Sequence, residues 1–209
     1  IIGIYKMRIS GSIIEDMPKK EAFFQDIIFF EKEFDGVMPL EIMIDTKRKK
    51  GVMKLSTLKR MEELETAIDE IPELSKPISV VNLVKYSKQA YYNGNPEFYE
   101  LPTKQEEAFI LSYIKNSTQK GNENMLKSYV DSTGQYARIT TFMRDIGTDK
   151  MQKIEERLQD KINHILDIYR IIYNKGLNTS QAVDFIEEEI RASDERDDIV
   201  TFIRDSGRG

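Results

Sequence analysis

The chain has 209 residues, of which 40% are hydrophobic and 32% charged, and its formal net charge is -5. This length can build one or two domains with hydrophobic cores, and the weakly acidic balance argues against nucleic acid as a partner. There is no cysteine, which excludes disulfides and thiolate chemistry, and no stretch reaches the roughly 18 apolar residues that a membrane span needs.

The first predicted element is a helix over residues 18–34 with a dense aromatic stripe on one face. Such a stripe usually packs into a core. The alternative is that it lines a path for a hydrophobic cargo molecule. The candidate cargo-lining residues are Phe23, Phe24, Ile27, Phe30 and Phe34.

Residues 38–84 read as strand, helix, strand. Residues 38–45 alternate between apolar and other side chains, which predicts a strand with one buried face. Ser56 is expected to cap a helix that Pro72 ends, and the β-branched run from Ile78 to Val84 predicts a second strand. The basic run 47–50 between the first strand and the helix is more often a solvated turn than a site for anionic ligands.

The pattern then begins again after a tyrosine-rich turn region and a short helix at 103–116. Residues 126–130 and 136–144 are expected to be extended, and Thr148 is expected to begin a helix whose apolar face includes Ile154 and Leu158. A duplicated strand–helix–strand unit predicts an α+β fold of the split βαβ, ferredoxin-like kind. Three helical pieces, at about 167–175, 179–191 and 194–206, form a small C-terminal appendage.

No catalytic constellation emerges from the sequence. Neighbouring acids such as Glu62 and Glu63 point about 100° apart on a helix and do not converge on one atom. The single histidine, His164, reads as a residue at the boundary of a helical core rather than as a base or ligand. Nucleotide-phosphate loops and calcium loops are absent, so we expect no enzyme activity, no cofactor and no metal.

Residues 9–46, with Phe34-Asp35-Gly36-Val37-Met38-Pro39 at their centre, resemble the loop after the first membrane helix of resistance-nodulation-division exporters related to Patched. The resemblance extends to about residue 165. It implies a porter domain that faces the periplasm at the bacterial inner membrane and exports hydrophobic or lipid-like molecules. The implied partners are the membrane domain of the same exporter, a lipid or other hydrophobic molecule, and further copies of the chain.

Residues 167–209, with Gly176-Leu177-Asn178-Thr179-Ser180-Gln181-Ala182, are similar to the C-terminal helices of UDP-N-acetylglucosamine O-acyltransferases, the first enzymes of lipid A synthesis. The β-helix of those enzymes and its catalytic histidine have no counterpart here. Because the two resemblances imply different compartments, the hypothesis is a chain of two parts, 1–165 and 166–209, with a junction near Ile165–Asp167.

Three classes of function therefore remain open. A transport-associated domain is the main prediction and implies binding of hydrophobic ligands. A fragment of an acyltransferase is the alternative and implies binding of acyl carrier protein or a UDP-sugar. A non-catalytic interaction module, which would pair an exposed edge strand with a partner, is the third.

Overall fold

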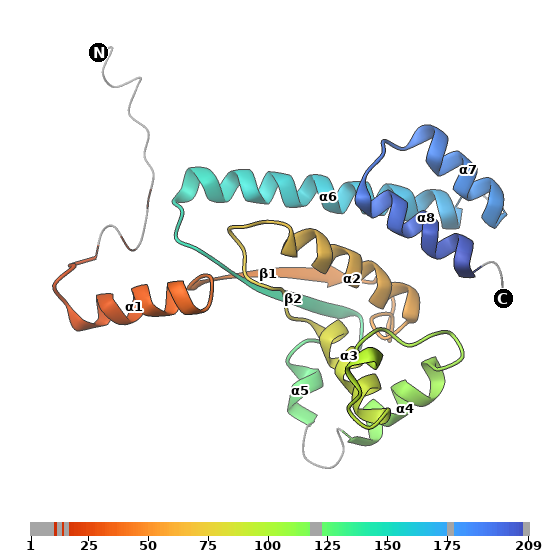
Figure 1. Ribbon diagram of the computed structural model, residues 1–209, viewed down its shortest axis with the longest axis horizontal. Helices are drawn as coiled ribbons and strands as arrows, with labels where there is room; N and C mark the ends of the chain where they lie inside the picture. Colours follow the sequence, from red (N-terminus) through yellow and green to blue (C-terminus); the bar gives the residue numbers. More distant parts are fainter. Residues whose placement is uncertain (1–10, 12–13, 15–16, 118–122, 175–177, 207–209) are drawn as a thin grey trace. The chain divides into compact units, whose positions relative to one another are not determined.

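The computed structural model describes residues 11, 14, 17–117, 123–174 and 178–206. The chain forms two compact units, Ile1–Met151 (unit 1) and Gln152–Gly209 (unit 2). The division falls earlier in the chain than the expected junction near residue 166. One helix, α6 (Thr148–Asn174), runs through both positions (Figure 1).

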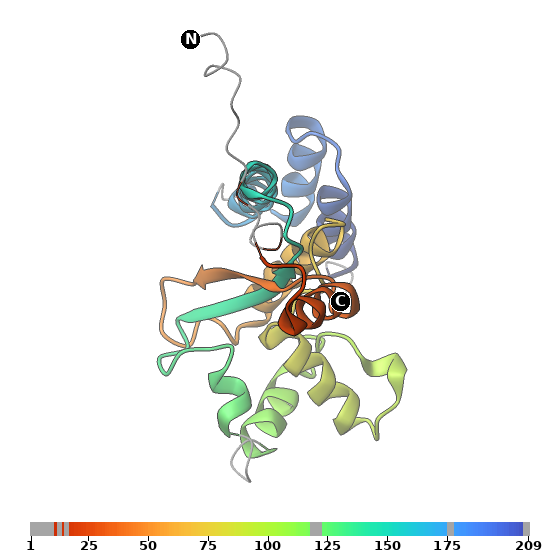
Figure 2. The same ribbon diagram turned by 90° about the vertical axis from the view of Figure 1, so that its left-hand side faces the viewer.

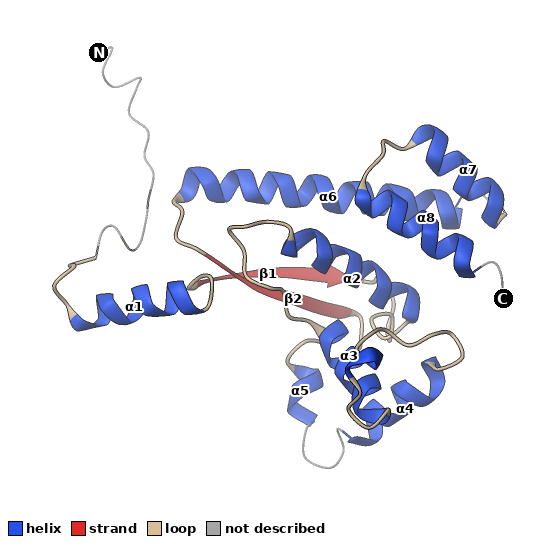
Figure 3. Cartoon of the chain, in the orientation of Figure 1, coloured by secondary structure: helices blue, strands red, loops and turns tan. Residues whose placement is uncertain are grey.

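Unit 1 is built around a sheet that, in the described part of the chain, has two antiparallel strands, β1 (Met38–Asp45) and β2 (Tyr136–Met143). The register pairs Met38 with Met143 and Asp45 with Tyr136. Figure 3 shows the two strands in red among helices, so the predicted α+β class is confirmed. Both strands were also predicted at nearly these bounds, because their alternation gives each strand one buried or half-buried face.

Helices make up most of the remaining described part of unit 1. They are α1 (Ala22–Glu33), α2 (Leu55–Asp69), α3 (Val80–Tyr91), α4 (Glu107–Ser117) and α5 (Glu123–Lys127), with a short 3-10 turn, η2 (Pro96–Phe98). Ala137, Ile139 and Thr141 of β2 are buried on one face of the sheet, and α3 contacts both β2 and α2. Figure 2 shows β1 and β2 side by side with α3 to α5 beyond one edge of the sheet.

The strand predicted over 78–84 is wrong, because this segment forms the start of α3. Ser79 caps the helix: its Oγ accepts a hydrogen bond from the Val81 amide at 2.9 Å, and its own amide donates to Asn82 Oδ1 at 2.8 Å. This capping box sets a helical start that overrides the β-branched composition. Only Ile78 keeps an extended role, as a bridge to Thr140.

Two smaller predictions are also wrong. Residues 126–130 were expected to be extended, but α5 ends at Lys127 and only Val130 bridges to β2. Helix α2 begins at Leu55 after Lys54, so Ser56 lies inside its first turn and does not cap it. The predicted helix at 103–116 is confirmed as α4, and the basic run 47–50 is exposed as predicted.

The start of β1 depends on a glycine. Gly36 adopts a φ of +151°, and a Cβ there would lie 2.5 Å from the main-chain carbon of Met143. Only glycine allows the chain to leave α1 and enter the sheet this close to β2. The ion pair between Asp35 and Arg144, at 2.7 Å, closes the same junction.

Unit 2 is entirely helical in the described residues. It contains most of α6, α7 (Thr179–Glu189) and α8 (Asp194–Ser206). The three predicted helical pieces are therefore confirmed, except that the first continues α6 rather than standing alone. Its core consists of Ile165, Ile168, Val183, Ile186, Ile199, Val200 and Ile203.

Candidate functional site

The aromatic stripe predicted as core lies on α1, and no residue of that helix is buried. Phe23, Phe30 and Phe34 are about half exposed, at 46%, 50% and 58%, whereas Phe24 and Ile27 are half-buried. Phe30 stacks on Phe34 with ring centroids 5.5 Å apart. The prediction that the stripe belongs to the core is wrong, because no residue of α1 is buried. Its role as a cargo-lining surface stays a prediction.

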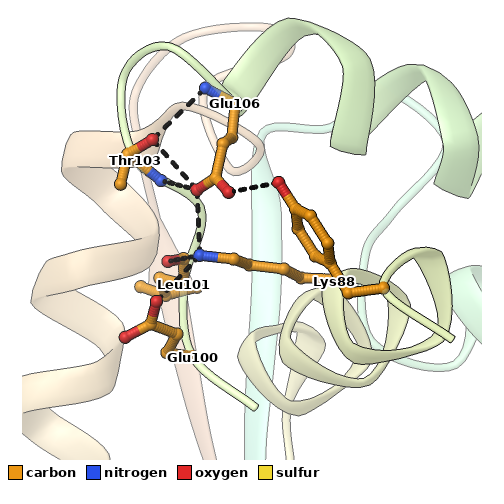
Figure 4. A network of polar contacts seen from close by, with 6 residues as sticks. Lys88, Glu100, Leu101, Thr103 and Glu106 are labelled. Atoms are coloured by element: carbon orange, nitrogen blue, oxygen red, sulfur yellow. Dashed lines mark hydrogen bonds and ion pairs between the residues drawn. The ribbon is translucent and has the colours of Figure 1, made fainter. Parts of the chain in front are cut away.

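In the described part of unit 1, a cluster of polar side chains surrounds Lys88 (Figure 4). The ammonium of Lys88 lies 2.9 Å from a carboxylate oxygen of Glu100 and 2.9 Å from one of Glu106. It also donates to the main-chain carbonyl of Leu101 at 3.5 Å. The Lys88 side chain is only 2% exposed, so α3 carries a charge inside the unit.

Glu106 is the second centre of this cluster. Its carboxylate accepts hydrogen bonds from the Tyr92 hydroxyl at 2.8 Å and from the amide and hydroxyl of Thr103 at 2.8 and 2.9 Å. These donors, together with Lys88, connect the end of α3 to the beginning of α4. The Glu106 side chain is 15% exposed, whereas that of Glu100 is 62% exposed, so Glu106 is the principal counter-ion.

The electrostatics of the cluster favour its charged form. Burial raises the pKa of Glu106, but hydrogen bonds from Lys88, Thr103 and Tyr92 outweigh it and bring this pKa down to about 2. Burial lowers the pKa of Lys88, and the hydrogen bonds to Glu106 and Glu100 outweigh that effect, so its pKa is raised. An ammonium held charged by two carboxylates is no nucleophile. The cluster therefore connects α3 to the segment that leads into α4.

A second buried charge lies on α2. Glu65 is 7% exposed, and within the described residues its Oε1 has no hydrogen-bond partner. Burial raises the pKa of Glu65 to about 7, although a hydrogen bond from Ser79 and the charge of Lys85 lower it. Lys85 itself pairs with Glu62 at 2.5 Å, one turn before Glu65.

Neither Lys88 nor Glu65 was identified from the sequence. Both follow from helical spacing once α2 and α3 are placed: Val80, Val84 and Lys88 repeat every four residues and share the buried face of α3. The signal for Lys88 was hidden because residues 78–84 were predicted to be a strand.

In unit 2, His164 and Ser193 meet. The Nε2 atom of His164 lies 2.8 Å from the Ser193 hydroxyl. The Ser193 hydroxyl oxygen accepts a hydrogen bond from the Arg196 amide at 3.1 Å. Ser193 thereby caps the first turn of α8. Its contacts with His164 and Arg196 are both part-buried. Arg196 donates to the Ile190 carbonyl at 3.1 Å, which fixes the loop between α7 and α8.

Replacing Ser193 with alanine is expected to destabilise α8 by about 1 kcal/mol, because the Arg196 amide loses its acceptor and His164 loses its partner. Hydrogen exchange of residues 194–206 would show faster exchange in this variant than in the wild-type chain. Ser180→Ala, at an exposed position inside α7, is the matched control and should leave exchange in α8 unchanged. Equal exchange in the Ser193 variant and the wild type would contradict the capping role.

Within the described residues, no group of three or more His, Cys, Asp or Glu side chains is arranged to hold a metal ion. In the same part of the chain, every helix is too short or too polar to cross a membrane.

Comparison with protein families gives a match for unit 2. Residues 152–209 match the family described as UDP N-acetylglucosamine O-acyltransferase, domain 2. The matched residues have the same bounds as the compact unit Gln152–Gly209. No curated protein and no solved structure matches the chain.

The match supports one of the two resemblances, for the part of the chain that it covers. The predicted similarity of the C-terminal helices to acyltransferases is confirmed and reaches back to residue 152. The classification of the chain under transport, as an exporter of the resistance-nodulation-division kind, is wrong, since the family evidence is for an acyltransferase domain. The exporter resemblance rested on sequence texture and on element order, and the helix at Val80–Tyr91 lies where the expected element order had a strand.

Proposed function

We propose that unit 2 is the helical second domain of a UDP-N-acetylglucosamine O-acyltransferase, which takes part in the first step of lipid A synthesis. The observation that carries this proposal is that the family match and the compact helical unit share their bounds at 152 and 209. A segment whose described residues form a hydrophobic core of their own is the kind of part that recurs as a domain.

We propose further that this domain contributes binding and supplies no catalytic group. His164 and Ser193 are the two residues whose chemistry could suggest otherwise. The Ser193 hydroxyl is committed to the Arg196 amide at the start of α8, and His164 is held against that hydroxyl. Their geometry supports a structural role, which leaves the exposed faces of the helices for recognition.

The acyltransferase proposal predicts two ligands, a UDP-sugar and acyl carrier protein. It also implies a cytoplasmic location, where those enzymes work. The periplasmic location, the exporter membrane domain and the lipid cargo were predicted through the exporter resemblance and gain no support from the acyltransferase match.

Thermal denaturation of the full chain with UDP-N-acetylglucosamine tests the proposal. A ligand that binds the folded domain raises its melting temperature as its concentration rises. UDP-glucose, which lacks the acetamido group, is the matched control ligand. Titration with acyl carrier protein, followed by hydrogen exchange, should protect amides within 152–209 and spare unit 1. If neither ligand stabilises or protects unit 2, the proposed function is wrong.

A further inference from the structure

The two edges of the sheet in unit 1 differ. On β2, the edge away from β1 is occupied: the Thr140 amide donates to the Ile78 carbonyl at 2.9 Å, and the Ile78 amide donates back at 2.8 Å. Further along, the Ser75 amide donates to the Phe142 carbonyl at 2.8 Å, and the Phe142 amide donates to the Ser75 hydroxyl at 2.9 Å. The outer main-chain groups of β2 are thus satisfied by neighbouring segments.

The outer edge of β1 is different. The Thr46 amide donates to Gln135 at 3.1 Å, so Thr46 faces β2. Because main-chain groups alternate along an antiparallel strand, the even-numbered residues of β1 face β2 and the odd-numbered ones face outward. The outward amides and carbonyls of Glu41 and Met43 have no main-chain partner in the described part of the chain. The Met43 side chain is 75% exposed.

We propose that this edge binds the β1 strand of a second copy of the chain, in antiparallel orientation, to give a continuous four-stranded sheet across a two-fold axis. Pairing of two edge strands satisfies the outward amides and carbonyls of both copies. It also turns a two-stranded sheet, which is marginal in isolation, into one of ordinary size. The inference concerns unit 1 alone and does not depend on the function proposed for unit 2.

Charge distinguishes among the three registers whose two-fold axis lies at Glu41, Ile42 or Met43, near the middle of β1. If the two-fold axis passes through Glu41, the two Glu41 side chains face each other, and if it passes through Met43, Glu41 faces Asp45 of the other copy. Like charges directly opposite on a sheet are destabilising. With the axis at Ile42, Glu41 lies opposite Met43 of the other copy, and no acidic pair is formed.

The same register continues both faces of the sheet. Leu40 then lies opposite Ile44 of the other copy, and Ile42 lies opposite its own equivalent, so the half-buried apolar face extends across the axis. Pro39 faces outward and has no amide hydrogen to donate, which is compatible with an edge strand, and its carbonyl can accept from the Asp45 amide of the other copy.

Charges at the two ends of β1 favour the antiparallel orientation. The acids Glu33 and Asp35 precede the strand, and the exposed basic run Lys47–Lys50 follows it. Antiparallel pairing places the basic run of each copy beside the acidic end of the other, whereas parallel pairing places like charges together. The complementarity of the strand with itself therefore favours a second copy over an unrelated peptide.

Cysteine cross-linking tests the register directly, since the natural chain contains no cysteine. Opposite residues that do not exchange hydrogen bonds have Cα atoms about 4.5 Å apart, which a disulfide can bridge. Ile42→Cys should therefore form a disulfide-linked dimer under mild oxidation. In Glu41→Cys and Met43→Cys the equivalent residues are diagonal neighbours, roughly 7–8 Å apart, and should cross-link much more slowly.

Analytical ultracentrifugation of the wild-type chain should show a monomer–dimer equilibrium that weakens with added salt. Met43→Glu places acids opposite each other and should abolish the dimer, while Met43→Gln is the neutral control that retains it. Circular dichroism checks that both variants stay folded. A chain that is monomeric at every concentration would overturn the proposal. A dimer that Met43→Glu leaves intact would overturn it too, and so would faster cross-linking of the Glu41→Cys or Met43→Cys variant than of the Ile42→Cys variant.

Discussion

Lys88→Met is expected to lower the free energy of unfolding of unit 1 by about 3–5 kcal/mol, since removing one partner of a buried ion pair leaves the other charge uncompensated. The methionine fills the space of the lysine stem, so the loss comes mainly from Glu106, whose side chain is 15% exposed and retains only the Tyr92 and Thr103 donors. Urea denaturation followed by circular dichroism, with hydrogen exchange of α3 and α4, measures the change.

Two further variants separate the role of the pair from simple loss of packing. Glu100→Gln should cost less than about 1 kcal/mol, because Glu100 is 62% exposed and water screens its charge. The double variant Lys88→Met with Glu106→Gln should be more stable than Lys88→Met alone, since no unpaired charge remains. A Lys88→Met chain as stable as the wild type would mean that the cluster contributes nothing to the fold.

The same cluster gives unit 1 a dependence on acid. The pKa of Glu106 is about 2 in the folded chain, below its usual value of 4.5. A depressed carboxyl pKa contributes stability that is present above the unfolded value and is lost as the pH falls from 4.5 towards 2. The wild-type chain should therefore lose stability over this range more steeply than the Glu106→Gln variant does.

Glu65→Gln is expected to stabilise unit 1 at pH 8 by about 2–3 kcal/mol, the opposite sign to the Lys88 variant. The pKa of Glu65 is raised from 4.5 to about 7 by burial. Between these two values the folded chain holds a proton that the unfolded chain has released, so stability falls as the pH rises through this window. The neutral glutamine avoids that loss and keeps a polar group near Ser79.

Unfolding free energies at pH 5 and pH 8 provide the check. The variant and the wild type should differ little at pH 5, where Glu65 is protonated in the fold, and should separate as the pH rises. Glu62→Gln is the matched control on the same helix; it breaks the partly exposed pair with Lys85 and should destabilise slightly at both pH values. If Glu65→Gln gave no gain at pH 8, the buried carboxyl would have to be satisfied in another way.

The sequence could predict the elements whose pattern is local. The alternation of Met38–Asp45 and Tyr136–Met143 identified both strands. The helical piece predicted at 179–191 corresponds to α7, where the structure shows Asn178 as the capping residue and Ala182, Val183 and Ile186 on the buried face. The likeness of residues 167–209 to acyltransferases was also visible, since the segment carries a family pattern of its own.

Local pattern failed where two signals competed. The β-branched composition of residues 80–84 favours a strand, whereas the spacing of Val80, Val81 and Val84 is compatible with the buried face of a helix. The Ser79–Asn82 capping box stabilises the start of the helix, and the helix forms. The phenylalanines of α1 are as closely spaced as the apolar residues of a buried helix face, yet none is buried. Burial depends on which elements pack against the helix, and composition does not specify them.

Only the tertiary structure decided which charges meet and which strand edge is free. Lys88, Glu100 and Glu106 lie on α3, a loop and the approach to α4, and their pairing depends on how these segments fold back on each other. The free edge of β1 likewise follows from the placement of Ser75 and Ile78 along β2.

The sequence by itself determined the class of fold, the two strands and the family likeness of the helical unit, because these are properties of short, periodic segments. The buried charges and the open edge depend on contacts between residues far apart in the chain, which no local pattern encodes.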